Sequence, residues 1–359
     1  MVALLLGSLT ACARAPELIG IDNAAMPVAS VEQAKKRKIY IATTRQASQV
    51  PGAFFSGRRA AELGLASVTV SVPPIHKPGE LERPKVLPPD PKTEFAVIDP
   101  TIYATDRSFV SSINRSLARL SPMDRNILVF VHGYNNTLSD SVLRLAQFVE
   151  DTGFDGVPVL FSWASAAKPS QYVYDLNSAL AARPRLAEAA DIMGRTNARG
   201  FNLVAHSMGA FLTMEAIVQA ELRGGFNRSG RLRNIMLAAP DIDIDLFRAQ
   251  LSQIPEKDRV FFIFVSKDDS ALGFARTISG GVNRVGAADA TELEEFGVTV
   301  IDLSAVDDSS SGSHSKFAGS PEVVQLIGQG LQSSSRFGAP SQNQLEELLA
   351  GVPIRILGN

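Results

Sequence analysis

The chain has 359 residues, of which 45% are hydrophobic and 20% charged, and its formal net charge at pH 7 is −2. This composition is typical of a globular protein with a substantial core. The near-zero net charge, without basic runs interleaved with aromatic residues, argues against a nucleic-acid-binding protein. No apolar run reaches the roughly 20 residues that a membrane-spanning helix needs.

The N-terminal residues resemble the signal of a bacterial lipoprotein. A short apolar run from Val2 to Leu6 precedes the sequence Leu-Thr-Ala-Cys at residues 9–12. Lipoprotein precursors are acylated on the Cys thiol of such a pattern and cleaved just before it. Cys12 is the only cysteine of the chain and falls where the pattern requires it. We therefore predict that Cys12 is lipidated.

This interpretation divides the chain into a signal (1–12), a tether (13–35), a catalytic domain (36–331) and a C-terminal tail (332–359). Ala13, in place of Asp, resembles the outer-membrane sorting pattern, so we expect a lipid-anchored protein on the periplasmic side of the cell envelope. The alternative is a truncated secretory signal with an incidental cysteine. Because no charged residue precedes the apolar run, either the true start lies upstream or the signal is degenerate.

Runs of β-branched and aromatic residues recur along the domain and predict strands. The first three are separated by Pro-rich loops and predict an antiparallel lead-in. The later ones alternate with helical stretches, and several are apolar without alternation, as in parallel strands covered on both faces. This order predicts an α/β fold with a mostly parallel central sheet of about eight strands and helices on both faces. The predicted strands are 38–43, 67–72, 95–98, 126–132, 157–162, 201–205, 234–239, 260–266 and 298–303, and the predicted helices are 138–150, 172–193, 208–222 and 321–331.

A glycine-containing turn, His132-Gly133-Tyr134, follows the apolar strand that begins at residue 126. A turn of this kind can present a backbone N–H group to a negative charge that develops on a bound oxygen atom. We therefore predict that the turn at Gly133 presents the Tyr134 N–H for this purpose. The alternative is a turn that only leads into the helix at 138–150.

Four aromatic residues follow in and after the next strand: Phe161, Trp163, Tyr172 and Tyr174. They form either an apolar wall for an acyl chain or part of the core.

The strand at 201–205 leads into Ala205-His206-Ser207-Met208-Gly209, and a helical stretch follows directly. A serine hydroxyl is a poor nucleophile, so an enzyme that uses one holds it on a sharp strand-to-helix turn, exposed to a base and to backbone N–H groups. Small residues two positions before and after the serine permit such a turn. We predict that Ser207 is the nucleophile and that the Met208 N–H is the other oxyanion donor.

The base must be one of four histidines: His76, His132, His206 or His314. In this kind of fold the catalytic residues follow the order Ser, acid, His, and the His lies in the loop after the last strand. His314 lies in a Ser-rich loop after the strand at 298–303, so we predict that it is the base. His206 is expected to pack and to form hydrogen bonds, and His76 to lie in a surface loop.

The acid is expected at the carboxyl end of a late strand, where it orients the imidazole. Asp268 and Asp269 both follow the strand at 260–266. We favour Asp269, because a turn three residues past the strand directs its side chain toward the His loop. Asp268, and Asp241 at the end of the preceding strand, are the alternatives. Such a triad requires no metal and no cofactor.

With these residues in place, the chain resembles the α/β-hydrolase superfamily, and more closely the family of α/β hydrolases of unknown function that carries the number 900. The resemblance covers about residues 39–331. It rests on ATTR at 42–45, FSGR at 55–58, FVHGYNN at 130–136, FSWAS at 161–165, YD at 174–175, AHSMG at 205–209, AAPDID at 238–243, SKDD at 266–269 and HSKF at 314–317.

The resemblance implies an α/β-hydrolase fold, with Ser207, Asp269 and His314 as nucleophile, acid and base, and with Gly133-Tyr134 as the oxyanion turn. The family usually reads Trp-Pro-Ser where this chain has Trp-Ala-Ser at 163–165. This departure leaves the triad intact and is expected to relax the loop at the site.

Two classes of function follow. The first is hydrolysis of a small-molecule or lipid carboxylic ester through an acyl-serine intermediate. The second is a non-catalytic envelope lipoprotein that keeps the scaffold for binding. Acyl transfer to an alcohol other than water is a variant of the first. Retention of a nucleophile, a base, an acid and an oxyanion turn favours an enzyme.

Overall fold

The computed structural model describes residues 14–307, 313–332 and 353–358. Cys12 and the predicted signal lie outside these ranges. The strands of the described residues are β1 Lys35–Ala47, β2 Phe55–Val72, β3 Ala96–Ile102, β4 Asn126–Val131, β5 Val157–Ser162, β6 Gly200–His206, β7 Leu232–Ala238, β8 Phe261–Val265, β9 Thr299–Asp302 and β10 Arg355–Leu357.

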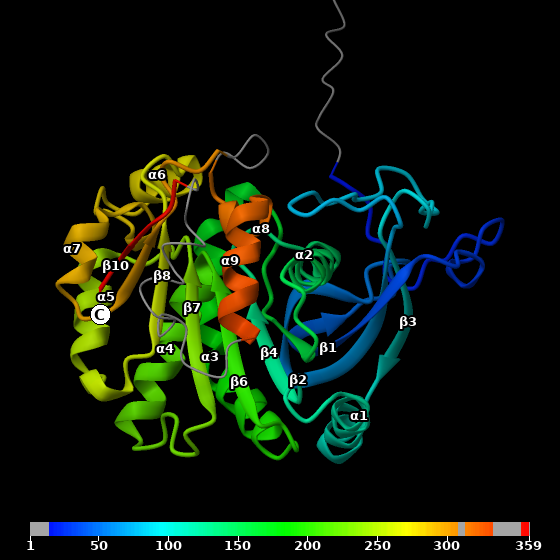
Figure 1. Ribbon diagram of the computed structural model, residues 1–359, viewed down its shortest axis with the longest axis horizontal. Coiled ribbons are helices and arrows are strands. Elements are labelled where there is room, and N and C mark those ends of the chain that lie inside the picture. The colour runs from blue at the N-terminus through cyan, green and yellow to red at the C-terminus, as the bar shows by residue number, and fades with distance from the viewer. Residues whose placement is uncertain (1–13, 308–312, 333–352, 359) are drawn as a thin grey trace, which may run out of the picture.

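These strands form one sheet in the order β10-β9-β8-β7-β6-β4-β5-β1-β2-β3 (Figure 1). From β9 to β1 in this order, each strand is parallel to its neighbour. The strands β2 and β3 extend the sheet in antiparallel fashion, which confirms the predicted lead-in. The predicted α/β fold with a mostly parallel central sheet is therefore confirmed.

The sheet has ten strands in the described residues instead of about eight. One of the additional strands is β10, which pairs with β9 in antiparallel fashion although its residues belong to the predicted C-terminal tail. Three residues are too few to show a periodic pattern, so this strand could not be predicted from the sequence.

Helices cover both faces of the sheet. They are α1 Asp106–Ala118, α2 Leu138–Asp151, α3 Tyr172–Gly194, α4 Met208–Leu222, α5 Ile244–Ser252, α6 Ser270–Ile278, α7 Ala290–Glu294, α8 Lys316–Gly319 and α9 Pro321–Gln332. The core cluster on one face draws on α1, α3, α4 and α5, and the cluster on the other face draws on α2, α8 and α9 (Figure 1). Every residue of β4, β5 and β8 is buried between these layers, as parallel strands require.

The helix α1 was missed by the sequence analysis. Its sequence is rich in Ser and Arg, and this composition hides the apolar face. That face nevertheless has helical spacing, because Phe109, Ile113 and Leu117 are buried at intervals of four residues. The helix begins at Thr105, whose side chain accepts a hydrogen bond from the Ser108 N–H.

The predicted tether is wrong for residues 14–34, which pack against the domain. Leu18 and Val28 are fully buried. The N–H groups of Ile19 and Gly20 donate to carbonyl oxygens of two other segments, at 2.8 and 2.7 Å. A few apolar residues in a segment rich in Ala and Pro are enough to hold it on the surface of the sheet domain.

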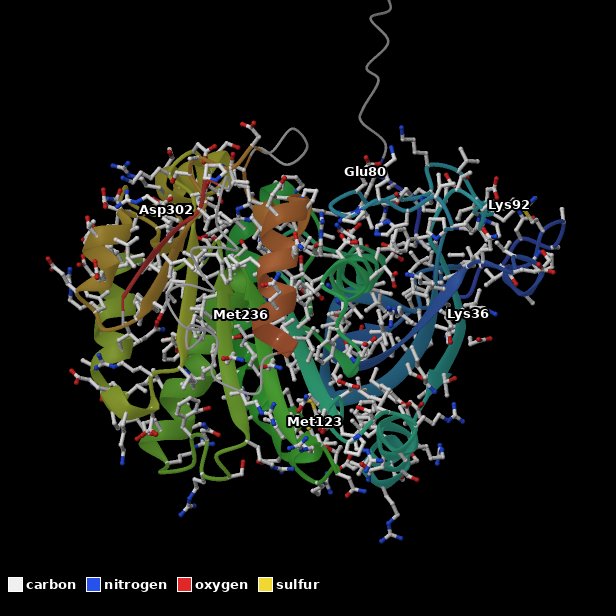
Figure 2. All side chains as sticks on the ribbon, in the orientation of Figure 1. Lys36, Glu80, Lys92, Met123, Met236 and Asp302 are labelled. Atoms are coloured by element: carbon white, nitrogen blue, oxygen red, sulfur yellow. The ribbon has the colours of Figure 1, made fainter. Side chains whose placement is uncertain are left out.

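Charged side chains such as Lys36 and Lys92 point outward, whereas Met236 is fully buried in the sheet (Figure 2). Among the described residues, no helix combines the length and the apolar character that crossing a bilayer requires.

His76 lies in the loop between β2 and β3, as predicted, but its side chain is only 7% exposed. Its ring nitrogens contact Glu82 and Asp151, each at 2.7 Å. Although burial alone would lower the pKa of His76, hydrogen bonds to Asp151 and Glu82 raise it above its usual value. His76 therefore fastens this loop to the end of α2 through its contacts with Glu82 and Asp151.

The contribution of His76 to stability is expected to depend on pH. The pKa of His76 is higher in the folded protein than in the unfolded chain, where it is about 6.5. The stabilisation is therefore full at a pH below the pKa of the unfolded chain, and it is lost as the pH rises through the pKa of the folded protein. Replacement of His76 by Gln should lower the free energy of unfolding by roughly 1–3 kcal/mol at pH 6 and by less at pH 9. Urea denaturation at both pH values measures the change in the free energy of unfolding. An equal decrease at pH 6 and pH 9 would contradict the predicted pH dependence.

Candidate active site

The carboxyl ends of the parallel strands form one edge of the sheet, which we call the catalytic edge. Ser207 lies there, between β6 and α4, with φ 54° and ψ −124°. This left-handed backbone is unfavourable for a residue with a side chain. Hydrogen bonds hold it, because the Ser207 N–H donates to Ala238 O at 2.9 Å and the Asp241 N–H donates to Ser207 O at 3.2 Å. The predicted strand-to-helix turn is therefore present.

The glycines around Ser207 are required by close packing. A Cβ atom on Gly209 would lie 2.4 Å from His132 O and 2.6 Å from Val131 O, both of them backbone atoms. A Cβ atom on Gly133 would lie 2.9 Å from Ser207 Cβ. Real Cβ atoms do not approach other atoms so closely, so both positions need glycine. The turn at Gly133 consequently packs directly against the serine.

The two predicted oxyanion donors are free in the structure. Across the described ranges, neither the Met208 N–H nor the Tyr134 N–H donates to a protein oxygen. Met208 is the first residue of α4, where backbone N–H groups lack partners within the helix and the helix dipole favours negative charge. Since the turn at Gly133 packs on Ser207, the two N–H groups belong to neighbouring segments at the same edge.

Asp269 and His314 are in contact. The Nδ1 atom of His314 lies 2.8 Å from Asp269 Oδ2, and the Asp269 side chain has no exposed surface. The other carboxylate oxygen, Oδ1, accepts the Leu272 N–H at 2.9 Å and so caps α6. With Nδ1 occupied in this way, Nε2 is the ring nitrogen of His314 that remains for proton exchange.

Asp268, one alternative acid, is held by other partners. Its carboxylate accepts hydrogen bonds from Ser313 at 2.6 Å and from the buried Nζ of Lys316 at 2.9 Å. Although partial burial would raise the pKa of Asp268, hydrogen bonds from Ser266, Ser313 and Lys316 lower it to about 2. Ser313 and Lys316 flank His314, so Asp268 ties the loop that carries His314 to the turn that carries Asp269.

Asp241, the other alternative, faces a different set of groups. Its Oδ2 accepts the Tyr172 hydroxyl at 2.8 Å, and its Oδ1 lies 3.3 Å from Nε of Arg284. Burial raises the pKa of this carboxyl group, against the lowering effects of Arg284 and Tyr172. Of the three candidate acids, Asp269 is the one that contacts the imidazole of His314.

His206 supports the loop that carries His314. Its Nε2 lies 3.0 Å from His314 O, and its ring packs against those of His314 and Phe317, with centroids 4.7 and 4.8 Å away. Burial lowers the pKa of His206 well below its usual value, so the ring is neutral and donates from Nε2. This agrees with the packing and hydrogen-bonding role expected of it.

His132 is also unsuited to be the base. It is 1% exposed and stacks on Trp163, with ring centroids 5.0 Å apart. Burial and the nearby charge of Arg45 lower the pKa of His132 to about 3. The ring is therefore neutral near pH 7 and lies under the turn at Gly133.

The four aromatic residues suggested as an acyl wall do not form one surface. Phe161 and Trp163 are in the core, at 1% and 0% exposure. Tyr174 packs under the guanidinium of Arg59 and donates to Gly57 O. Only Tyr172 lies beside the site. Phe161 and Trp163 are two residues apart and are buried in the same core cluster, whereas Tyr172 and Tyr174 belong to α3, so the four rings do not line one cavity.

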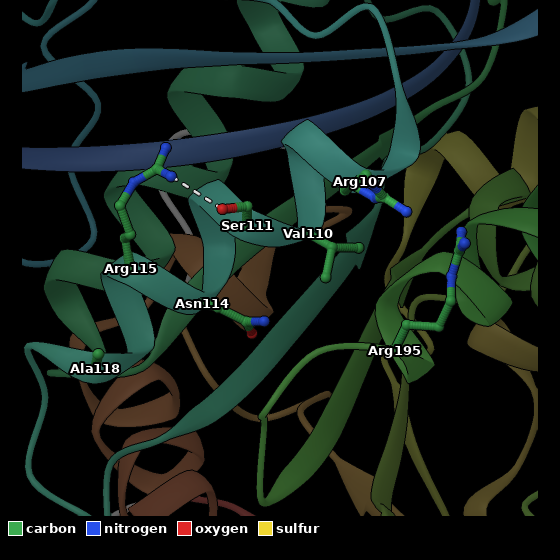
Figure 3. Close-up of a pocket in the computed structure, with 7 residues that line it drawn as sticks. All are labelled: Arg107, Val110, Ser111, Asn114, Arg115, Ala118 and Arg195. Atoms are coloured by element: carbon green, nitrogen blue, oxygen red, sulfur yellow. Dashed lines mark hydrogen bonds between the residues drawn. The ribbon is translucent and has the colours of Figure 1, made fainter.

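A separate pocket, lined mainly by α1, lies away from Ser207 (Figure 3). It carries Arg107, Arg115 and Arg195, and Arg115 donates to Ser111 at 3.0 Å. Arg195 follows the end of α3, where the chain turns back to begin β6, so this pocket is at the edge of the sheet opposite to Ser207. In the ranges that the structure describes, no group of three or more His, Cys, Asp or Glu residues is arranged to hold a metal ion.

The sheet order, the strained serine after β6 and the His–Asp contact at the catalytic edge define a protein of the α/β-hydrolase superfamily. The chain belongs to the family described as "Alpha/beta hydrolase of unknown function (DUF900)", whose model matches residues 107–330. This confirms the resemblance recognised from the sequence motifs.

Several solved structures align with this chain at low sequence identity. A hyperthermophilic esterase from the archaeon Pyrobaculum calidifontis is 12% identical over 64% of this chain and 93% of its own, with a TM-score of 0.35. A fungal esterase from Rhizomucor miehei is 12% identical over 85% of both chains, with a TM-score of 0.36. A predicted hydrolase from Thermoplasma acidophilum is 14% identical over 59% of this chain and 89% of its own, with a TM-score of 0.33. No curated protein matches the sequence.

Proposed function

We propose that the protein is a serine hydrolase that cleaves carboxylic esters, with Ser207 as nucleophile, His314 as general base and Asp269 as the acid that orients it. The observation that carries this proposal is the 2.8 Å contact between His314 Nδ1 and Asp269 Oδ2. The backbone carbonyl of His314 also accepts a hydrogen bond from His206, the residue before Ser207. Membership of a hydrolase family supports the general class of reaction.

In the proposed reaction, Ser207 Oγ attacks the ester carbonyl carbon while Nε2 of His314 takes the hydroxyl proton. Asp269 stabilises the imidazolium that forms. The N–H groups of Met208 and Tyr134 bind the oxyanion, each contributing about 3 kcal/mol in comparable enzymes. Collapse of the tetrahedral intermediate breaks the C–O bond, and His314 returns the proton to the leaving alcohol. A water molecule then repeats the sequence, releasing the carboxylic acid and free Ser207.

A fluorophosphonate probe tests this proposal directly, because it phosphonylates only an activated serine. The wild-type protein should be labelled, the Ser207→Ala variant should not, and a Ser111→Ala variant on the surface of α1 should be labelled like wild type. Equal labelling of wild type and Ser207→Ala, or none of wild type, would contradict the proposal. A series of p-nitrophenyl esters then gives the preferred acyl length.

We also propose that acylated Cys12 anchors the protein in the cell envelope, with the catalytic edge close to the lipid. Arg14, two residues later, donates to Asn135 O at 3.1 Å and pairs with Asp140 at 2.7 Å. Because two residues span at most about 7 Å, an acylated Cys12 would hold the catalytic edge close to the membrane surface. This placement favours an ester substrate that the membrane presents. Palmitate should label a chain with its full upstream region, and not its Cys12→Ser variant; failure to label the former would refute the anchor.

A further inference from the structure

A buried arginine lies behind the turn that follows β4. Arg45, in β1, is 2% exposed. It donates from Nε to Ser162 Oγ at 2.8 Å, from Nη1 to Ser165 O at 3.0 Å and from Nη2 to Asn136 O at 2.8 Å. Burial lowers the pKa of Arg45 to about 10, so it stays charged at neutral pH. A buried charge is costly unless it is fully hydrogen-bonded, and Arg45 meets that condition with groups of the loops at the catalytic edge.

A buried carboxylate holds the same turn from the other side. Asp175, in the first turn of α3, has no exposed surface. Its Oδ2 accepts Ser165 Oγ–H at 2.6 Å and the Asn135 N–H at 3.2 Å, and its Oδ1 accepts the Ala166 N–H at 2.7 Å. The charge of Arg45 acts on this carboxylate across the buried space between them.

Ser165 joins these two buried charges. Its carbonyl accepts from Arg45, its hydroxyl donates to Asp175, and its Oγ accepts the Asn136 N–H at 3.2 Å. The side chain of Asn136 then donates to Gly133 O at 3.2 Å and to Tyr134 O at 2.7 Å.

The segment 133–136 is thus fixed at nearly every polar backbone atom other than the Tyr134 N–H. The turn includes Asn135 with φ 58°, a left-handed conformation that would relax without such partners. A free N–H group in a turn whose four carbonyl groups are all hydrogen-bonded is what an oxyanion donor requires.

We propose that Arg45, Asp175 and Ser165 are positioning residues for the oxyanion turn, and that they hold the Tyr134 N–H where the tetrahedral intermediate needs it. This inference rests on the proposed function. The two charged groups are buried and act through the backbone of residues 135 and 136, so they do not contact the substrate. Donors must lie about 2.7–3.1 Å from the developing oxyanion, and a misplacement of about 1 Å costs up to about 100-fold in rate.

The Asp175→Asn variant tests the inference, with the exposed Asp155→Asn as its matched control. An amide retains the shape but cannot accept all three hydrogen bonds. For hydrolysis of a p-nitrophenyl ester, kcat should fall roughly 10- to 100-fold, with KM within about threefold of wild type. The affinity for an arylboronic acid, which forms a tetrahedral adduct with the serine, should fall in proportion to kcat/KM. Asp155→Asn should match wild type in both measurements.

The Ser165→Ala variant gives a second test that removes only one hydroxyl group. It should lower kcat and boronic acid affinity together, by roughly tenfold. If Asp175→Asn does not fold, as judged by circular dichroism, this variant decides. A folded variant with wild-type kcat, or with a raised KM alone, would overturn the inference while leaving the proposed function intact. A wild-type protein that neither hydrolyses esters nor binds the boronic acid would overturn both.

Discussion

Replacement of Asp269 by Asn is expected to lower kcat for ester hydrolysis by about 10⁴-fold. The amide would favour the wrong tautomer of His314 and would not stabilise the imidazolium. Stability should change little, because Asn also caps helices well and can still accept the Leu272 N–H at the start of α6. Steady-state kinetics with a p-nitrophenyl ester measure the first effect, and thermal unfolding measures the second.

The Asp241→Asn variant is the control for this experiment. Its carboxylate bonds to Tyr172 and lies beside Arg284, without contact to His314, so kcat should fall by less than about tenfold. A large loss in Asp241→Asn together with a small loss in Asp269→Asn would show that the acid has been assigned to the wrong strand end.

Replacement of Gly209 by Ala is expected to destabilise the fold by roughly 2–3 kcal/mol or more. The added Cβ would lie 2.4 Å from His132 O and 2.6 Å from Val131 O, and backbone atoms of a central strand cannot move aside cheaply. The shift should also displace the first turn of α4, and with it the Met208 N–H. Urea denaturation measures the free energy of unfolding.

Gly273→Ala, in α6, is the matched control, because a Cβ there would meet no atom within 4 Å. This substitution should raise the free energy of unfolding by about 0.5–1 kcal/mol, since alanine is the better helix former. If Gly209→Ala proved as stable as wild type, the close packing of α4 on β4 would be wrong.

The parallel part of the fold could be predicted because its signals are local. Uninterrupted apolar runs marked β4, β5 and β8, and the helix α4 spans the predicted residues, Met208–Leu222. Chain order indicated that His314 would meet an acid at the end of a late strand, because parallel strands bring their carboxyl ends to one edge. It did not distinguish Asp269 from Asp268 and Asp241, and the position in the turn after β8 favoured Asp269. The short strand β10 lacked such a signal, and in α1 the helical spacing of Phe109, Ile113 and Leu117 was hidden among polar residues.

The buried charges of the site could not be predicted in this way. Arg45, Asp175 and Lys316 are charged residues, which are normally solvated. Their burial depends on other segments of the chain: Arg45 in β1 meets the turn after β5, 120 residues later, and Lys316 meets the turn after β8, 50 residues earlier. The motifs that carried the family resemblance include all three residues, but a motif match does not say which side chains meet.

The double use of the Asp269 carboxylate has a consequence for heat resistance. One oxygen holds the ring at 314 and the other closes the first turn of a nine-residue amphipathic helix on the surface. Short surface helices fray before a central sheet melts. Warming should therefore separate Asp269 from His314 while the strands remain folded. Ester hydrolysis should be lost at a lower temperature than the native circular dichroism spectrum.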